Sequence, residues 1–233
     1  MIRKTLVLAL ISMFYTSFAI AEVGINIGVS AQLGEMSAKG SESNSDTQTN
    51  AADGVGTQSR TEEAIFGSAG FFIEKTLGSR FALGYSNIMH DIGLGTADNA
   101  RAASLGAAGA TVAATTHELK ADITGFNTFY ATIRLTDFLY VKAGSVNVDL
   151  DTRFTKAGVV SSDYGSGSHS LDGTVFGLGL ENKSDNGLFF RLEVNSYDID
   201  GKSVASSGTD STLTAKLEDV SGETARISIG KSF

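Results

Sequence analysis

The sequence predicts an all-β protein, a single eight-stranded antiparallel up-and-down transmembrane β-barrel with short periplasmic turns and long external loops. Three observations predict this fold class. Stretches that alternate apolar and polar residues recur along the chain, and the longest match a tilted strand crossing a bilayer better than a globular strand. The connections between them alternate between short and long. The chain ends in an alternating stretch that reaches an aromatic residue, Phe233, as expected where the last strand pairs with the first and leaves no edge.

The first 21 residues are expected to be a signal peptide that is removed. Arg3 and Lys4 precede an apolar run that ends near residue 18, and Ala19, Ile20 and Ala21 place small residues at the cleavage positions. The alternative, a membrane anchor helix, is disfavoured because the run is short for spanning a bilayer. The barrel domain then covers residues 22–233.

Eight strands follow in the order of the chain. We expect them near residues 23–34, 65–74, 81–85, 119–135, 139–150, 173–181, 188–195 and 225–233. In the fifth, the apolar residues change parity after Ala143, so that Val146 and Val148 continue on the opposite face. We interpret this change as a β-bulge near Gly144 and Ser145.

The connections separate into two classes. Tight turns are predicted near residues 77–80, 136–138 and 184–187, and four long polar segments cover about 36–63, 91–117, 155–173 and 200–222. Polar segments of this size are unusual in a compact domain, so a soluble β-sandwich is the less favoured alternative. Aromatic residues gather near the short turns and the C-terminus, as in the interfacial girdle of a membrane barrel: Phe71, Phe72, Phe81, Phe138, Tyr140, Phe189, Phe190 and Phe233.

Composition excludes several classes of function. The formal net charge is −8 and becomes more negative when Arg3 and Lys4 leave with the signal peptide, which argues against nucleic-acid partners. Without cysteine the chain has neither disulfides nor thiolate metal ligands. No phosphate-binding glycine motif or ordered calcium loop is present. We therefore expect no cofactor and no metal.

The alternation also places charged residues inside the barrel. An eight-stranded barrel is just wide enough for side chains to fill it, and buried charges must pair. We interpret the interior charges as a structural plug, with a constricted ion path as the alternative. The residues on the interior phase are Glu74, Arg80, Lys120, Asp122, Arg134, Lys142, Glu181, Arg191, Glu193 and Arg226. The candidate network comprises Glu74, Lys142, Glu181, Arg191, Glu193 and Arg226.

Residues 173–181, 191–194 and 228–233 resemble the eight-stranded outer-membrane β-barrel family, which includes OmpA-type transmembrane domains and opacity-like, porin-family proteins. The resemblance implies the outer membrane of a Gram-negative bacterium, with its lipid and lipopolysaccharide as partners. It also implies insertion by the barrel-assembly machinery with periplasmic chaperones. The assembly signal would be Ile227, Ile229, Gly230 and Phe233, although Lys231 replaces the penultimate aromatic residue often found there.

The expected function is non-enzymatic: a structural barrel whose loops contact an external ligand that the sequence does not name. A narrow porin is the second hypothesis and a loop-sited lipid-modifying enzyme the third. The histidines are His90, His117 and His169, and their spacing assembles no nucleophile, base and orienting acid. We therefore assign no catalytic residue.

Overall fold

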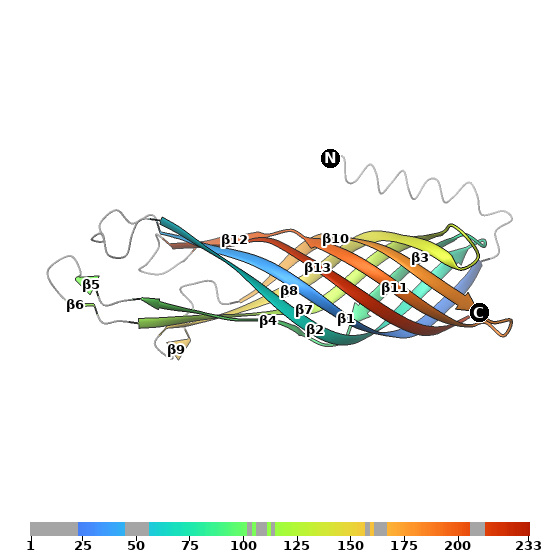
Figure 1. The fold of residues 1–233 in the computed structure, drawn as a ribbon, viewed down its shortest axis with the longest axis horizontal. Coiled ribbons are helices and arrows are strands. Elements are labelled where there is room, and N and C mark those ends of the chain that lie inside the picture. Colours follow the sequence, from blue (N-terminus) through green and yellow to red (C-terminus); the bar gives the residue numbers. More distant parts are fainter. Residues whose placement is uncertain are drawn as a thin grey trace.

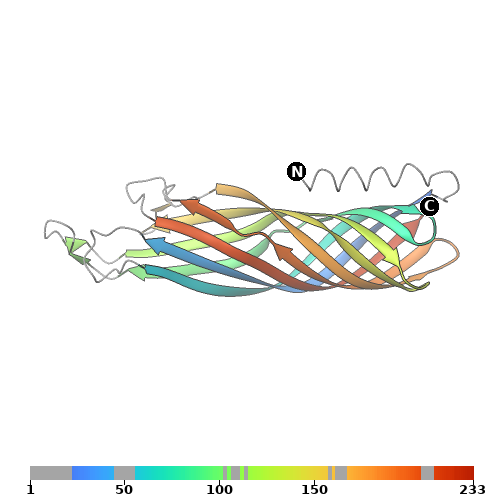
Figure 2. The same cartoon turned by 90° about the horizontal axis from the view of Figure 1, so that it is seen from above.

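The computed structural model describes residues 23–44, 56–101, 104–105, 111–112, 115–156, 159–160, 167–205 and 213–233. The expected signal peptide, residues 1–21, lies outside the described residues. The described part forms an elongated, twisted barrel of long strands (Figures 1 and 2). None of the helices searched among these residues is long and apolar enough to cross a membrane.

Ten strands form the wall of the barrel. They are β1 (Val23–Asn44), β2 (Gly56–Leu77), β3 (Phe81–Ile88), β4 (Ile92–Arg101), β7 (Thr115–Arg134), β8 (Leu139–Lys156), β10 (Gly167–Lys183), β11 (Leu188–Ile199), β12 (Lys202–Ala205) and β13 (Leu213–Ser232). Three short strands lie in the connections: β5 (Ser104–Leu105), β6 (Thr111–Val112) and β9 (Val159–Val160).

Antiparallel pairing closes these strands into a ring. The first strand, β1, pairs with both β2 and β13, and the β7–β8 pairing closes the other side. Strands β3 and β4 both pair with β7, while β11 and β12 both pair with β13. Each of these two pairs occupies one position in the wall. The result is a closed eight-stranded antiparallel barrel, which confirms the predicted fold class.

The short turns lie together with the C-terminus at one end of the barrel (Figure 1). Gly78 and Gly187 adopt positive φ angles of 67° and 83° in two of these turns, a conformation that glycine reaches without strain. At the other end, the strands continue into segments that the sequence suggested were loops. For example, β1 reaches Asn44 and pairs with β2 back to Gly56. Backbone hydrogen bonds between the paired strands hold these polar residues in an extended conformation. The strands therefore form without burying much side-chain surface.

The outer wall carries an apolar belt beside the short turns. On β1, Val23, Ile25, Ile27, Val29 and Leu33 all point outward and are between 46% and 70% exposed. At a rise of roughly 3.3 Å per residue and a tilt of about 40°, this stretch spans about 25 Å along the barrel axis. That height matches the apolar band of a transmembrane barrel. We call this part of the barrel the membrane segment and the part beyond it the external segment.

The predicted bulge at Gly144 is wrong. Strand β8 pairs with β10 without a register shift through Gly144 and Ser145, and Val146 and Val148 point inward, where they are buried. The apolar residues of β8 change from the outer face to the inner face at this point because the polarity of the two faces of the wall inverts here. Beyond the belt the inner face becomes an apolar core that includes Met36 and Val220, because the outer face now meets water.

The outer face of the external segment is acidic. Exposed carboxylates stand where the belt ends on several strands, among them Glu35, Asp172, Asp198 and Glu223. Glu35 on β1 lies directly opposite Glu223 on β13. The interior is therefore polar where the exterior is apolar, and apolar where the exterior is charged.

A bulge does occur, in β7. The register of β7 against β8 shifts between Thr124 and Asn127, and Gly125 has a φ of +60°. The shift reverses the inward and outward positions on its two sides, so Ile123 is buried inside. Lys120 and Asp122 form an ion pair of 2.7 Å with side chains 50% and 30% exposed. Their predicted place in the interior is therefore wrong.

Arg80 is also outside the buried network. It is exposed in the turn between β2 and β3, at the mouth of the bore. Its carbonyl oxygen accepts a hydrogen bond of 2.8 Å from the backbone N–H of Arg134.

Candidate functional site in the barrel bore

The membrane segment encloses a cluster of charged side chains contributed by five strands. Each member occupies an inward position of the period-two alternation, and each is at least nine-tenths buried. The cluster contains the six predicted residues: Glu74 on β2, Lys142 on β8, Glu181 on β10, Arg191 and Glu193 on β11, and Arg226 on β13.

Arg191 organises the first group of charges. Its two terminal nitrogens donate to the two oxygens of Glu74 at 2.6 and 2.7 Å, and its Nε donates to Glu181 Oε2 at 2.5 Å. Arg134 forms a second ion pair with Glu181. Such bidentate pairing suits a buried guanidinium because it satisfies several donors at once. In this group two arginines balance two carboxylates.

Glu193 organises the second group. It accepts hydrogen bonds of 2.6 Å from Lys142 Nζ and 2.7 Å from the Tyr140 hydroxyl. Arg226 Nη1 lies 3.9 Å from the Glu193 oxygen that Lys142 already contacts. Two cations therefore share one carboxylate in this group.

Aromatic rings separate the charges from the wall. The Arg191 guanidinium lies 5.2 Å from the centroid of Phe72, 4.6 Å from that of Phe189 and 5.5 Å from that of Tyr140. These three residues were expected in the outer girdle, but all three are buried inside. The other five girdle residues, Phe71, Phe81, Phe138, Phe190 and Phe233, are exposed on the outside.

Glycines make room for the interior rings. Each inward ring stands directly opposite a glycine on the neighbouring strand: Gly28 opposite Phe72, Gly84 opposite Tyr130, Gly179 opposite Tyr140 and Gly230 opposite Phe189. A Cβ atom at any of these glycines would overlap the ring. The signal that could have revealed the interior rings is therefore a glycine at the paired position, which becomes readable only once the register is known.

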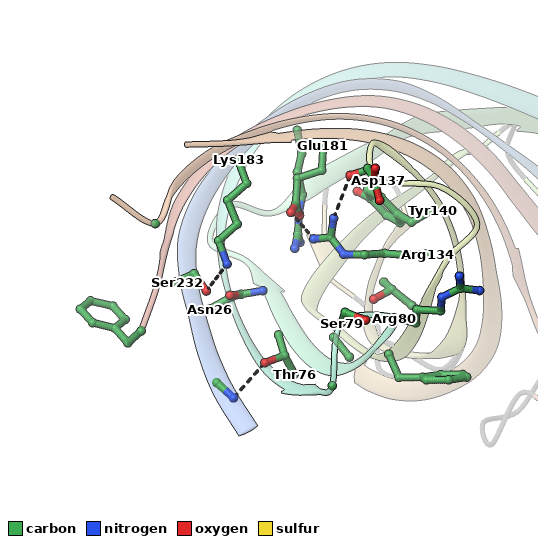
Figure 3. A pocket seen from close by; sticks show the side chains of 18 of the residues that line it. Asn26, Thr76, Ser79, Arg80, Arg134, Asp137, Tyr140, Glu181, Lys183 and Ser232 are labelled. Atoms are coloured by element: carbon green, nitrogen blue, oxygen red, sulfur yellow. Dashed lines mark hydrogen bonds and ion pairs between the residues drawn. The ribbon is translucent and has the colours of Figure 1, made fainter. Parts of the chain in front are cut away.

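A cavity of about 970 Å³ opens below the cluster at the short-turn end. Figure 3 shows Arg134, Tyr140 and Glu181 in its lining, with Lys183 hydrogen-bonded to Ser232 nearby. Arg191 also lines the cavity. We call this cavity the vestibule, and it gives solvent at the periplasmic end a route up to the first group of charges.

The histidines are spread along the wall. His90 is exposed between β3 and β4, and His169 is half-buried in β10. His117 lies in β7, opposite Lys156 of β8. Within the residues that the structure describes, no group of three or more His, Asp or Glu side chains is placed to hold a metal ion.

The predicted assembly signal lies on β13 and the residue after it. Ile227 and Ile229 point outward in the apolar belt, and Gly230 points inward beneath Phe189. Phe233 exchanges two backbone hydrogen bonds with Ile25 of β1, of 3.1 and 2.8 Å. Its ring is exposed on the outer surface, with 72% of the residue accessible.

A closed barrel with an apolar outer belt, short turns at one end and a polar interior in the same segment has the architecture of outer-membrane barrels. The chain is therefore an outer-membrane β-barrel protein of the Gram-negative type. No family model matches the sequence, and no curated protein matches it.

Solved outer-membrane proteins show a similar arrangement of strands. Ail, the attachment invasion locus protein of Yersinia pestis, is 11% identical, with 88% of this chain and 98% of Ail covered and a TM-score of 0.36. OprG from Pseudomonas aeruginosa is 12% identical over 87% of this chain and 95% of OprG, with a TM-score of 0.38. The outer membrane protease OmpT from Escherichia coli is 9% identical over 90% of this chain and 97% of OmpT, with a TM-score of 0.35.

Proposed function

We propose that this protein is a closed, non-enzymatic outer-membrane barrel with a structural and surface-interacting role. The observation that carries the proposal is the charge cluster in the bore. Together with Arg134, the cluster brings three carboxylates, four cations and several aromatic rings into a barrel whose width leaves room for little else. The membrane segment anchors the protein, and the external segment holds its strands and loops outside.

The plug is held by interactions that are costly to break. Glu74 accepts hydrogen bonds from Arg191, Tyr130 and Asn26, the last two at 2.9 Å each. Removing one partner of a buried ion pair costs on the order of 3–5 kcal/mol, because the other charge stays buried without compensation. An ion crossing the bore would have to separate several such pairs together, and we therefore infer that the resting barrel does not conduct.

The external segment supports the surface role. Its apolar core stiffens the wall beyond the membrane, and the β1–β2 and β1–β13 ladders continue to Asn44. On its outer face Lys39 pairs with Glu218 at 2.6 Å, and this hydrogen bond holds the pKa of Glu218 below its usual range. We propose that this segment presents the loops to an external ligand, while the belt contacts outer-membrane lipid and lipopolysaccharide.

Single-channel conductance of the refolded protein in a planar bilayer tests the closed bore. Wild type should be silent, and Glu74→Gln or Glu193→Gln should open a leak or lower the folded fraction. Glu223→Gln, which removes an exposed carboxylate, is the matched control and should behave as wild type. Discrete, reproducible current steps from the wild-type barrel would contradict the proposal.

A narrow porin is the second candidate, because the vestibule already carries solvent access to the Arg191 group. Conducting steps in wild type that change in selectivity with Arg134→Gln would favour it. Arg134 is the member of that group with the more exposed side chain, at 26%.

We also propose that the terminal strand is read by the barrel-assembly machinery after delivery by periplasmic chaperones. The exposed Phe233 ring and the outward Ile227 and Ile229 support this reading. Deleting Phe233 should reduce the folded protein in outer-membrane fractions, as measured by heat-modifiable mobility. Unassisted refolding into detergent should change less, and normal insertion of the deletion variant in cells would count against the proposal.

A further inference from the structure

When the partly exposed Arg134 is counted with the six buried residues, the charges of the two groups do not balance. In the first group Arg134 and Arg191 face Glu74 and Glu181. In the second group Lys142 and Arg226 share only Glu193. Among these seven described residues, four cations face three carboxylates, and the unbalanced positive charge lies in the second group. Because Lys142 is the closer of the two cations to Glu193, the excess falls on Arg226.

Arg226 is also poorly satisfied by its neighbours. It is nine-tenths buried, its ion pair with Glu193 spans 3.9 Å, and its Nε has no hydrogen-bond acceptor among the described residues. One face of its guanidinium lies 5.7 Å from the centroid of the Phe72 ring. An uncompensated charge in such surroundings is strongly destabilising, so the site calls for an acceptor that carries negative charge.

Two further unpartnered donors lie beside Arg226. Gln32 on β1 is the direct register partner of both Arg226 on β13 and Ser68 on β2, and all three point into the bore. Gln32 Nε2 and Ser68 Oγ are buried and have no hydrogen-bond partner among the described residues. Direct cross-strand partners hold their Cβ atoms about 5 Å apart. Three buried donors on adjacent strands can therefore reach one small ligand.

We propose that a small monovalent anion, of the size and charge of a halide, binds inside the bore against Gln32, Ser68 and Arg226. It accepts hydrogen bonds from Gln32 Nε2, Ser68 Oγ and Arg226 Nε, and it neutralises the excess charge of the second group. Water could satisfy the donors but would leave that charge in place. Asn195, two residues along β11 from the register partner of Arg226, has an unpartnered buried Oδ1 that can accept a hydrogen bond from a water hydrating the anion. The proposal does not depend on whether the bore conducts.

The test compares chloride with gluconate, an anion too large for the bore, at constant ionic strength. The measurement is the thermal unfolding midpoint of the refolded full chain in detergent micelles. Chloride should raise the wild-type midpoint saturably, by roughly 3–6 °C at ten times its Kd. Arg226→Gln should abolish this rise. Lys183→Gln removes an exposed cation at the vestibule, and as the matched control it should keep the full response.

A complementary variant supplies the negative charge from the protein. Gln32→Glu places a carboxylate at the position of the anion, so it should raise the midpoint in gluconate and remove the dependence on chloride. Ser68→Ala keeps every charge and loses one donor, and it should weaken the apparent chloride affinity several-fold. Ser68→Ala therefore keeps the proposal testable if Arg226→Gln does not fold.

Bromide locates the site directly. Crystals grown in bromide should show an anomalous peak between Gln32, Ser68 and Arg226, and crystals of Gln32→Glu should lack it. Equal unfolding midpoints of wild type in chloride and gluconate would overturn the proposal, as would a chloride response that Arg226→Gln and Gln32→Glu both retain.

Discussion

At the scale of single residues, the bore is built from complementary pairs of very small and very large side chains. Gly179 and Tyr140 face each other across β10 and β8, and the Tyr140 hydroxyl continues inward to donate to Glu193. A glycine in a strand is ordinarily a weakness. Here it lets a ring lie flat over the neighbouring backbone and carry a hydrogen-bond donor to the centre of the barrel.

The first prediction concerns this pair. Gly179→Ala should destabilise the barrel by roughly 1–3 kcal/mol, because the new methyl group overlaps the Tyr140 ring and displaces its hydroxyl from Glu193. Urea unfolding in detergent measures the effect. Gly167→Ala is the control, since no atom lies within 4 Å of the position its Cβ would take. Equal stability of the two variants would show that the ring moves freely.

The second prediction uses the unequal charges around Glu193. Glu193→Gln leaves Lys142 and Arg226 buried without a carboxylate and should cost on the order of 3–5 kcal/mol. Lys142→Gln leaves one cation facing one carboxylate and should cost clearly less. Unfolding midpoints in gluconate buffer compare the two variants. The reverse order of stability would mean that Lys142, and not Glu193, is the member whose loss leaves the cluster uncompensated.

At the scale of one element, β7 shows how a single glycine changes which residues face the bore. Gly125 takes a left-handed conformation at the bulge, the Asn127 amide donates to its carbonyl oxygen at 2.5 Å, and the register against β8 shifts there. Between the bulge and the short turn, β7 keeps the alternation of inward and outward side chains found in the membrane segment. On the other side of the bulge the alternation is reversed, so Ile123 enters the apolar core and Asp122 points outward.

The third prediction tests the requirement for that conformation. Gly125→Ala should cost about 1–3 kcal/mol, because a side chain at positive φ is strained and its Cβ would lie 2.7 Å from Asp149 Oδ2. Gly125→Asn should cost less, since asparagine tolerates the left-handed region. The midpoint of chemical unfolding separates them. If alanine were as well tolerated as asparagine, backbone strain would not govern this position.

At the scale of the whole molecule, the barrel consists of two segments with opposite polarity that share the same strands. The outer face of β11 illustrates the change, since Leu188, Phe190, Leu192 and Val194 are exposed apolar residues and Ser196 and Asp198 follow on the same face. The apolar belt ends between Val194 and Ser196 on this strand, and we expect the membrane boundary there. Lipid requires apolar groups on the outer face of the membrane segment. Water around the external segment permits an ordinary apolar core inside it.

The fourth prediction locates this boundary. Leu192→Lys places a charge within the lipid-facing belt and should destabilise the protein by roughly 2–4 kcal/mol in a bilayer. Ser196→Lys, four residues along the same face, should be close to neutral because it lies beyond the belt and directly opposite Glu223. Unfolding in liposomes, compared across the two variants, provides the measurement. A similar destabilisation by both substitutions would mean that the membrane boundary lies beyond Ser196.

The sequence by itself determined the features that depend on neighbouring residues. Alternation with a period of two identified the strands, the short turns between them, the closed barrel and the inward phase of Glu74, Glu181 and Arg191, because side chains on a strand alternate wherever it lies. The same local rule misplaced Lys120 and Asp122, and the expectation that aromatic residues gather in an outer girdle misplaced Phe72. Lys120 and Asp122 lie beyond a bulge, and Phe72 was assigned by its type and not by its parity.

Tertiary structure alone decided which charges meet and which side of the wall is apolar. Arg191 and Glu74 lie on strands that are not neighbours, and they meet only because the barrel closes around a narrow bore. Val146 and Val148 kept the alternation of β8 while its inner face changed from polar to apolar, and the sequence alone suggested a bulge there. That change follows from the depth of each residue in the bilayer, which is a property of the assembled barrel and not of any one strand.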